Sequence, residues 1–384
     1  MVDLVDRVTR KNQDLVSELP LTISAQYGLI DQNEFFDKRV ASKDVSGYYL
    51  IENGEFAYNK STSTDAPWGA IKRLDRYKNG VLSTLYIVFG IKENNPVDSD
   101  FLVSYYSTNL WHKGIHEIAA EGARNHGLLN IAPADFFETK LMIPQDIEEQ
   151  KKIGKYFEEL ERLITLHQRK CEETKTLKKY MLQKMFPQNG HSVPEIRFSG
   201  FTEDWEQRKL SELSEKTFGG GTPKTSNESF WKGNIPWIQS SDLIEGSLFD
   251  IEPRKYISQE AVDKSATKLV PENSVAIVTR VGVGKLAFMP FSYATSQDFL
   301  SLSVLKTEPQ FTVYALYKKL QSELNAVQGT SIKGVTKNEL LAKEIMIPCY
   351  EEQEKIGSYL HSLDHLITLH QRKCEEDENL RKNI

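Results

Sequence analysis

The sequence predicts an α+β protein: two globular domains of mixed helix and strand, separated by two long helices that form an antiparallel coiled coil. The segment LITLHQRKCEE occurs twice, at 163–173 and at 366–376, which indicates a duplicated element. Apolar residues recur through both copies at alternating spacings of four and three, which is typical of a coiled-coil seam. The intervening chain contains short β-rich runs bounded by Gly, Pro, Asn and Asp, which predict mixed domains.

The two predicted domains, or heads, differ from each other in sequence. The first, residues 1–147, contains β-rich runs at 47–58 and 81–91, and the second, residues 190–350, contains one at 273–291. Unlike the helical segments, the heads hardly match each other. A duplicated scaffold with two unlike heads indicates two different ligands.

The helical segments, 148–189 and 351–384, carry the repeat, which begins as EEQKKIGKYFEELER at 148–162 and as EEQEKIGSYLHSLDH at 351–365. A helix over 148–185 would be about 57 Å long. Because such a helix cannot bury its apolar stripe alone, the second copy is its expected partner. The predicted seam consists of Ile153, Phe157, Leu160, Ile164, Ile356, Leu360, Leu363 and Ile367.

Composition excludes several classes of protein. No stretch approaches the roughly 18 apolar residues that a membrane span requires, and the charged opening MVDLVDRVTRKNQD is unlike a signal peptide. The three cysteines cannot form a disulfide framework, so we expect a reducing cytoplasm. The net charge is −6, and no segment is a polycation. If the protein binds nucleic acid, local basic clusters or a partner must therefore contact the phosphates.

No catalytic motif is complete. RVGVGK at 280–285 ends like a phosphate-binding loop, but Thr279 and Leu286 stand where that loop needs a glycine and a Ser or Thr. GGGT at 219–222 lacks the later glycine of a dinucleotide fingerprint, and we expect it to form a flexible loop after a helix-like segment. The glycine motif for a methyl-donor cofactor and the Asn-Pro-Pro-aromatic tetrad are missing too. We therefore predict a noncatalytic chain whose function is binding.

The strongest metal signal lies on the repeated helices. His167 with Cys171, and His370 with Cys374, would supply two His and two Cys to a zinc ion if the helices crossed there. Since such residues more often simply occupy seam positions, we predict no metal in this chain.

Several segments resemble the half-repeats of specificity subunits from type I restriction-modification systems. In the second half these are VPEIRFSGFTEDWEQRKLSEL at 193–213, NIPWIQSSDL at 234–243 and QGTSIKGVTKNELLAKEIMIP at 328–348, followed by the EEQEKIG helix. In the first half, PLTISAQYGLIDQ at 20–32 and WGAIKRL at 68–74 look like the corresponding recognition domain. The similarity covers essentially the whole chain, in the order head, helix, head, helix.

The resemblance implies a DNA-binding subunit with two target recognition domains, 1–147 and 190–350, which each bind half of a bipartite double-stranded site. The central and distal conserved spacer helices, 148–189 and 351–384, would set the distance between the half-sites. Two methyltransferase subunits would dock on these helices, and restriction and translocase subunits would join them. S-adenosylmethionine, ATP and Mg are then expected on the partner subunits and not in this chain.

Candidate base-reading residues follow from side-chain type within the matching loops. Arg or Lys can pair with guanine, and Asn or Gln with adenine. The alternative for each residue is a solvated loop position. In the first head the candidates are Gln26, Tyr27, Lys60, Ser61, Arg73, Arg124, Asn125 and His126, and in the second Thr222, Lys224, Lys232, Gln239, Ser240, Arg280, Lys285, Ser331 and Lys333.

Two other function classes remain open. A protein-only coiled-coil scaffold or adaptor would use the same helices without DNA readout. A nuclease is weakly suggested by Asp135, Glu138 and Lys140. Residues 193–209 have no copy before Met1, and 182–187 have none after Ile384, which we interpret as a shortened or rearranged allele.

Overall fold

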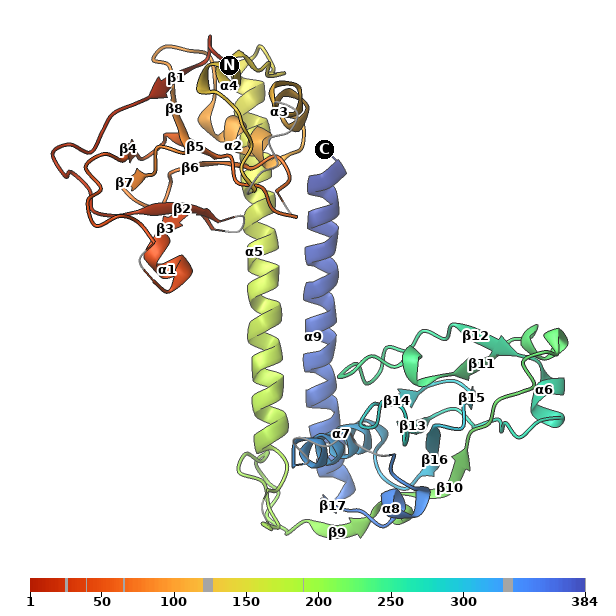
Figure 1. Ribbon diagram of the computed structural model, residues 1–384. Helices are drawn as coiled ribbons and strands as arrows, with labels where there is room; N and C mark the ends of the chain where they lie inside the picture. The colour runs from red at the N-terminus through yellow and green to blue at the C-terminus, as the bar shows by residue number, and fades with distance from the viewer. Residues whose placement is uncertain are drawn as a thin grey trace. The chain divides into compact units, whose positions relative to one another are not determined.

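The computed structural model describes residues 1–24, 27–38, 40–64, 66–119, 127–188, 190–326 and 334–383. The chain forms two compact units, Met1–Leu166 with Lys373–Ile384, and His167–Arg372. Each unit contains one head together with one end of each long helix (Figure 1). The helices are therefore shared between the units, and each unit is described by itself.

The two long helices are α5 (Ile147–Lys184) and α9 (Tyr350–Asn383), whose first turns both contain two glutamates that suit the positive helix N-terminus. In the second unit they run antiparallel, because His167 contacts His370 while Lys178, further along α5, forms an ion pair with Asp364, earlier in α9. In the first unit Glu161 of α5 pairs with Arg381 near the end of α9. The predicted antiparallel coiled coil is confirmed.

The first head contains a four-stranded antiparallel sheet in the order β1 (Val5–Val8), β8 (Ile87–Ile91), β5 (Phe56–Asn59), β6 (Ala70–Arg73). Its core is rich in aromatic residues, most of which come from β5, β8, α2 (Ser99–Ser107) and α4 (Pro133–Glu138), and α3 (His112–Ile118) adds Ile115. A second layer consists of the hairpin β2 (Leu21–Ser24) with β3 (Gly28–Asp31), the short helix α1 (Gln32–Phe36), and the pair β4 (Tyr49–Glu52) with β7 (Asn79–Leu82).

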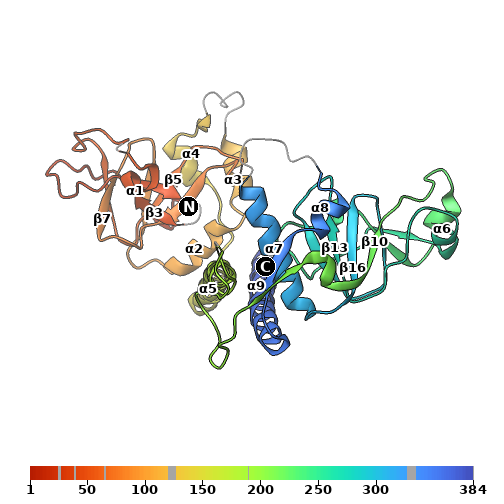
Figure 2. The same ribbon diagram turned by 90° about the horizontal axis from the view of Figure 1, so that it is seen from below.

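The second head contains an antiparallel sheet in the order β10 (Ser214–Gly219), β16 (Phe299–Leu305), β13 (Ser274–Val278), β14 (Leu286–Met289). Helix α7 (Pro309–Ala326) lies beside this sheet (Figure 2). It contributes residues to the main core cluster of the head, as does α8 (Lys337–Leu341). A second sheet has the order β12 (Lys255–Ile257), β11 (Ile235–Ile238), β15 (Ala294–Thr295), with α6 (Gln259–Asp263) after β12. The strands β9 (Glu206–Lys209) and β17 (Glu344–Ile347) pair near α9.

The two main sheets have the same strand order. In each of these sheets the first strand along the chain lies at the edge and pairs with the last strand along the chain, as Val5 does with Ile91 and Ser214 with Leu305. Two heads that hardly match in sequence therefore share one topology. Strand pairing depends on backbone hydrogen bonds, which many residue choices allow, so topology persists where sequence does not.

The EEQ and KIG parts of the repeat form the same joint in each unit. Gln150, fully buried, accepts a hydrogen bond from the Asp98 backbone N–H before α2, and Gln353 accepts one from the Glu308 N–H before α7, both at 2.9 Å. An added Cβ at Gly154 would lie 2.8 Å from the Phe101 nitrogen, so the glycine allows close packing of α2 on α5. Gly357 has the same role for α7 on α9.

Part of the predicted seam contacts the heads as well as the partner helix. Phe157, Leu160 and Ile164 of α5 are buried as expected. Three α9 residues, Ile356, Leu360 and Leu363, instead belong to the main core of the second head, where Met181 and Leu182 of α5 also pack. Ile153 packs likewise against the core of the first head, and Ile367 is half-buried. The N-terminal part of each long helix thus packs against the core of a head. The heptad pattern alone does not distinguish this packing from contact with the partner helix.

Candidate nucleic-acid interface

A cleft of about 1100 Å³ opens on the second head beside β11 and β12. Its walls come from β12, from the loop that joins β10 to β11, and from the residues that follow β15. Every strand that borders it belongs to the second unit. The residues that line it include Thr222, Trp231, Lys232, Trp237, Gln239, Arg254, Lys255 and Gln297.

Two tryptophans give the cleft a rigid base. Trp237 on β11 is buried, and its indole N–H donates to the Gly221 carbonyl at 3.0 Å. Trp231, at the end of a short 3-10 helix (Glu228–Trp231), packs edge-to-face on Trp237 with ring centroids 4.9 Å apart. Such an aromatic pair contributes about 0.5–1.5 kcal/mol beyond its buried area, which stabilises this conformation of the loop.

The glycine run before this loop is closely packed, which corrects the expectation of a flexible loop after a helix-like segment. It follows strand β10, and an added Cβ at Gly220 would lie 1.8 Å from the Ser296 carbonyl oxygen. At Gly221 the same atom would lie 2.6 Å from the Ala266 carbonyl carbon. The glycines are required because the backbone approaches two neighbouring segments.

The rim of the cleft carries cations and amides. Lys232, Arg254 and Lys255 are exposed, and the Lys255 ammonium lies 5.8 Å from the centroids of both tryptophan rings. The Thr222 hydroxyl donates to the Gln297 side-chain oxygen at 2.9 Å. Cations can contact phosphates, while amide and hydroxyl groups can contact base edges. The cleft therefore combines the two kinds of contact that sequence-specific DNA binding needs.

The side chain of Asp242 connects the rim to the fold. Its carboxylate is buried and accepts a hydrogen bond from the Gln239 backbone N–H at 2.8 Å. The Arg254 guanidinium lies 3.7 Å from the other carboxylate oxygen. Gln239 and Arg254, from different strand ends, are thereby held on one edge of the cleft.

Only part of the predicted set for the second head meets at this cleft. Thr222, Lys232 and Gln239 line it. Lys285 instead turns inward, where its ammonium donates to the Leu243 carbonyl at 2.9 Å and the Ser240 carbonyl at 3.4 Å. Lys224 and Arg280 are exposed but do not line the cleft, and the predicted Ser331 and Lys333 lie outside the described residues.

Sequence reasoning missed Asn234, Arg254, Lys255, Tyr256 and Gln297, all of which line the cleft. Arg254, directly before β12, and Lys255 and Tyr256, its first two residues, are consecutive and exposed. This run of exposed basic and aromatic residues was the feature of the sequence that could have indicated the cleft. Its position opposite the glycine loop depends on the β11–β12 pairing, which brings Trp237 beside Lys255.

In the first head, the predicted Gln26, Arg124, Asn125 and His126 lie outside the described residues. Tyr27 is 61% exposed on the β2–β3 hairpin. The Lys60 ammonium donates to the Ile131 carbonyl at 3.4 Å, and burial lowers its pKa. Ser61 forms an isolated bridge with Leu128. Lys60 and Ser61 both lie on the segment that directly follows β5. Contacts of these two residues with DNA stay predictions.

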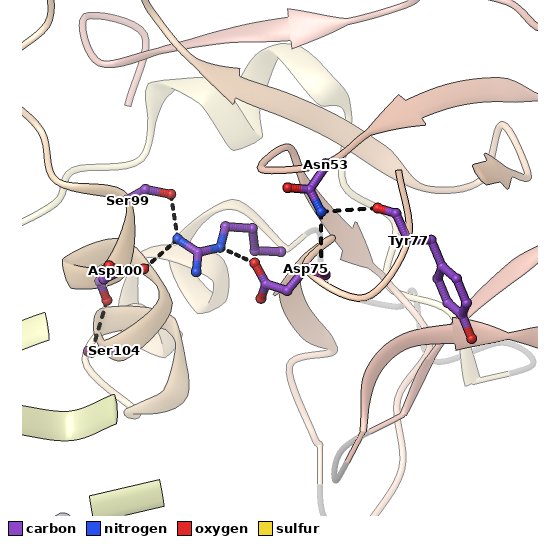
Figure 3. Close-up of polar contacts among 7 residues, drawn as sticks. Asn53, Asp75, Tyr77, Ser99, Asp100 and Ser104 are labelled. Atoms are coloured by element: carbon purple, nitrogen blue, oxygen red, sulfur yellow. Dashed lines mark hydrogen bonds and ion pairs between the residues drawn. The ribbon is translucent and has the colours of Figure 1, made fainter. Parts of the chain in front are cut away.

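Arg73, also predicted to contact bases, is engaged inside the first head. Its guanidinium donates to Asp75 at 2.5 Å and to the Ser99 hydroxyl at 2.7 Å, and Asp100 lies at 2.7 Å. Asp75 and Asp100 lie on opposite sides of this group (Figure 3). The Arg73 side chain is 17% exposed. These contacts tie β6 to α2, a geometry that favours a structural role, while a base contact of Arg73 stays a prediction.

Comparison with known proteins gives a consistent set of relatives. A family model described as the type I restriction modification DNA specificity domain matches residues 43–176 and 202–378. A specificity subunit of the MjaIX type I restriction enzyme from Methanocaldococcus jannaschii is 31% identical over 186 residues, which are 47% of this chain and 41% of that protein. The putative MjaX specificity subunit from the same organism is 24% identical over 351 residues, covering 90% of this chain and 79% of the relative.

Solved structures share the fold. A type I restriction-modification S subunit from M. genitalium has a TM-score of 0.58 at 11% identity, over 100% of this chain and 92% of that one. A chain from a study of type I R-M complex assembly has a TM-score of 0.51 at 20% identity, over 99% and 93%. No helix in the described parts of the chain is long and apolar enough to span a membrane.

Proposed function

The chain belongs to the family of type I restriction modification DNA specificity domains, and on this premise we propose that it is the DNA-reading subunit of a type I restriction-modification complex. Each head binds one half of a bipartite double-stranded site. The observation that carries this proposal is the double match of the family model, which each time covers most of one head and most of the helix that follows it. Two heads of equal topology but unlike surface residues are suited to two different half-sites.

In the second head we propose the cleft beside β11 and β12 as the base-reading surface. Its cations lie on the exposed rim, and amide side chains line the same cleft as the packed tryptophan pair. Preorganised groups lose less conformational entropy on binding, which favours specificity. A good bidentate contact contributes about 1–3 kcal/mol of discrimination between bases.

We further propose that two methyltransferase subunits dock on the helices and that restriction subunits complete the complex. The net charge of −6 supports partners that contribute phosphate contacts. S-adenosylmethionine, ATP and Mg belong to those partners, and this chain is noncatalytic. The complex acts in the cytoplasm.

The experiment that tests the function is methylome sequencing of a host that lacks other adenine methylation. Expression of the chain with its methyltransferase subunits is expected to modify one bipartite motif, which disappears when the chain is omitted. A protein-only scaffold would leave the modified sequence independent of this chain. Duplex binding by the complex that shows neither sequence preference nor salt dependence would also contradict DNA readout.

Substitutions in the cleft should distinguish a residue that contacts phosphate from a residue that reads a base. We expect Lys255→Ala to weaken DNA binding by the complex about equally for all sequences and to reduce the salt slope by about one. We expect Gln239→Ala to lower discrimination at one base pair by about 1–3 kcal/mol. The measurement is competition binding with single-base variants of the mapped site at several salt concentrations.

The matched control is Lys264→Ala, directly after α6, whose ammonium pairs with Glu260 at 2.9 Å outside the cleft. It should leave both the affinity and the salt slope near the wild-type values. Equal effects of Lys255→Ala and Lys264→Ala would place the base-reading surface elsewhere on the head.

A further inference from the structure

The crossing of the two long helices in the second unit brings two histidines face to face. The Nδ1 atoms of His167 on α5 and His370 on α9 lie 3.3 Å apart. The ring centres are 5.5 Å apart, so the two nitrogens lie between the rings and point toward each other. Both side chains are half-buried and remain accessible from solvent.

The repeat explains this contact. Each histidine is the fifth residue of the identical segment LITLHQRKCEE, and the two segments run antiparallel. Identical antiparallel segments that meet at their fifth residues place each histidine opposite its own copy. The arrangement has local two-fold symmetry, in which a single ion can be bound equally by both sides.

The chemistry of two facing imidazoles allows two occupants of the gap. One ring can donate its Nδ1 proton to the other, or both rings can present lone pairs to a cation. Zinc–nitrogen bonds of 2.0–2.1 Å at a tetrahedral angle place two nitrogens about 3.3 Å apart. The observed Nδ1–Nδ1 separation equals this distance. Because the rings face each other along the Nδ1–Nδ1 line, both rings must rotate to direct their lone pairs at one ion, which requires no movement of either helix.

The four-residue zinc set considered from the sequence does not form. The Cys374 thiol donates to the Glu378 carboxylate at 3.7 Å. Among the described residues, no group of three or more His, Cys, Asp or Glu is placed to hold a metal. Two imidazoles with water in the remaining positions suit zinc and its divalent neighbours, since imidazole binds these metals well.

We propose that His167 and His370 form a divalent transition-metal site, of which zinc is the expected occupant, that links α5 to α9. A bound ion stabilises the helix pair because the separated helices offer only one of the two ligands each. This proposal goes beyond DNA readout and concerns the isolated chain, so it can fail while the proposed function holds.

The test is zinc titration of the purified full chain by calorimetry, with thermal unfolding followed at each metal concentration. The wild-type chain is expected to bind zinc and to unfold at a higher temperature when zinc is present. His167→Gln and His370→Gln should each weaken binding by more than about tenfold, because losing even an outer-shell partner costs 10–100-fold. His365→Gln, an exposed histidine elsewhere on α9, is the matched control and should bind like the wild type.

A second measurement keeps the proposal falsifiable if a variant folds poorly. Cu²⁺ bound to the wild-type chain is expected to show two equivalent nitrogen ligands by electron paramagnetic resonance. Wild-type zinc affinity in His167→Gln or His370→Gln would overturn the proposal. So would a copper spectrum with a single nitrogen, which would leave a shared proton as the occupant of the gap.

Discussion

Exchange of residues 190–350 for the second head of another family member is expected to change one half of the methylated motif completely. The other half, and the number of base pairs between the halves, should stay the same. The reason is that α5 and the first head are retained, while every residue of the proposed cleft lies within the exchanged segment. Methylome sequencing of the host gives the answer directly.

The exchange must respect the joint between the second head and α9. Ile356, Leu360 and Leu363 lie beyond the exchanged segment yet belong to the core of this head. A donor head must therefore accept these side chains and the close approach at Gly357. Copurification with the methyltransferase subunit and an unchanged helical content by circular dichroism show that the chimera is assembled.

The reciprocal exchange of residues 1–147 is the control, and it should change only the other half of the motif. If either chimera altered both halves, the heads would not bind DNA independently. If an assembled chimera altered neither half, base readout would reside outside the heads.

The long helices could be predicted from the sequence nearly to the residue, because their signals are local. A periodic apolar stripe and an exact repeat locate α5 within one residue of the predicted start, and the need to bury that stripe predicts the antiparallel partner. The heads were predicted only as α+β domains. Their shared strand order depends on pairings such as Val5 with Ile91, which no local pattern encodes.

The candidate site was harder to predict for a related reason. Lys232 and Lys285 are both loop lysines near glycine. Lys232 lies on the rim of the cleft, whereas Lys285 turns inward and donates to the backbone carbonyls of Ser240 and Leu243. Arg73 likewise has the side chain expected of a base reader, yet it is engaged by two carboxylates. Side-chain type indicates what a residue can bind, while the tertiary fold decides which partner it meets.

Substitution of Glu352 by Ala should cause a large loss of stability in the second unit. Its carboxylate is fully buried at the start of α9 and accepts two hydrogen bonds from Arg197, both at 2.8 Å. Removing one partner of a buried ion pair leaves a poorly solvated charge, which costs about 3–5 kcal/mol. The free energy of unfolding, measured by urea denaturation of the full chain, should fall by an amount near the lower end of this range, because the Arg197 side chain is 15% exposed.

The repeat supplies a matched control, because Glu149 occupies the same position in the first copy of the EEQ motif but is exposed. Glu149→Ala removes the same atoms from the first turn of the same kind of helix, so it isolates the effect of burial. We expect a change within about 0.5 kcal/mol, as for most surface substitutions. Equal losses for Glu149→Ala and Glu352→Ala would show that the helix N-terminus, and not the buried pair with Arg197, needs the carboxylate.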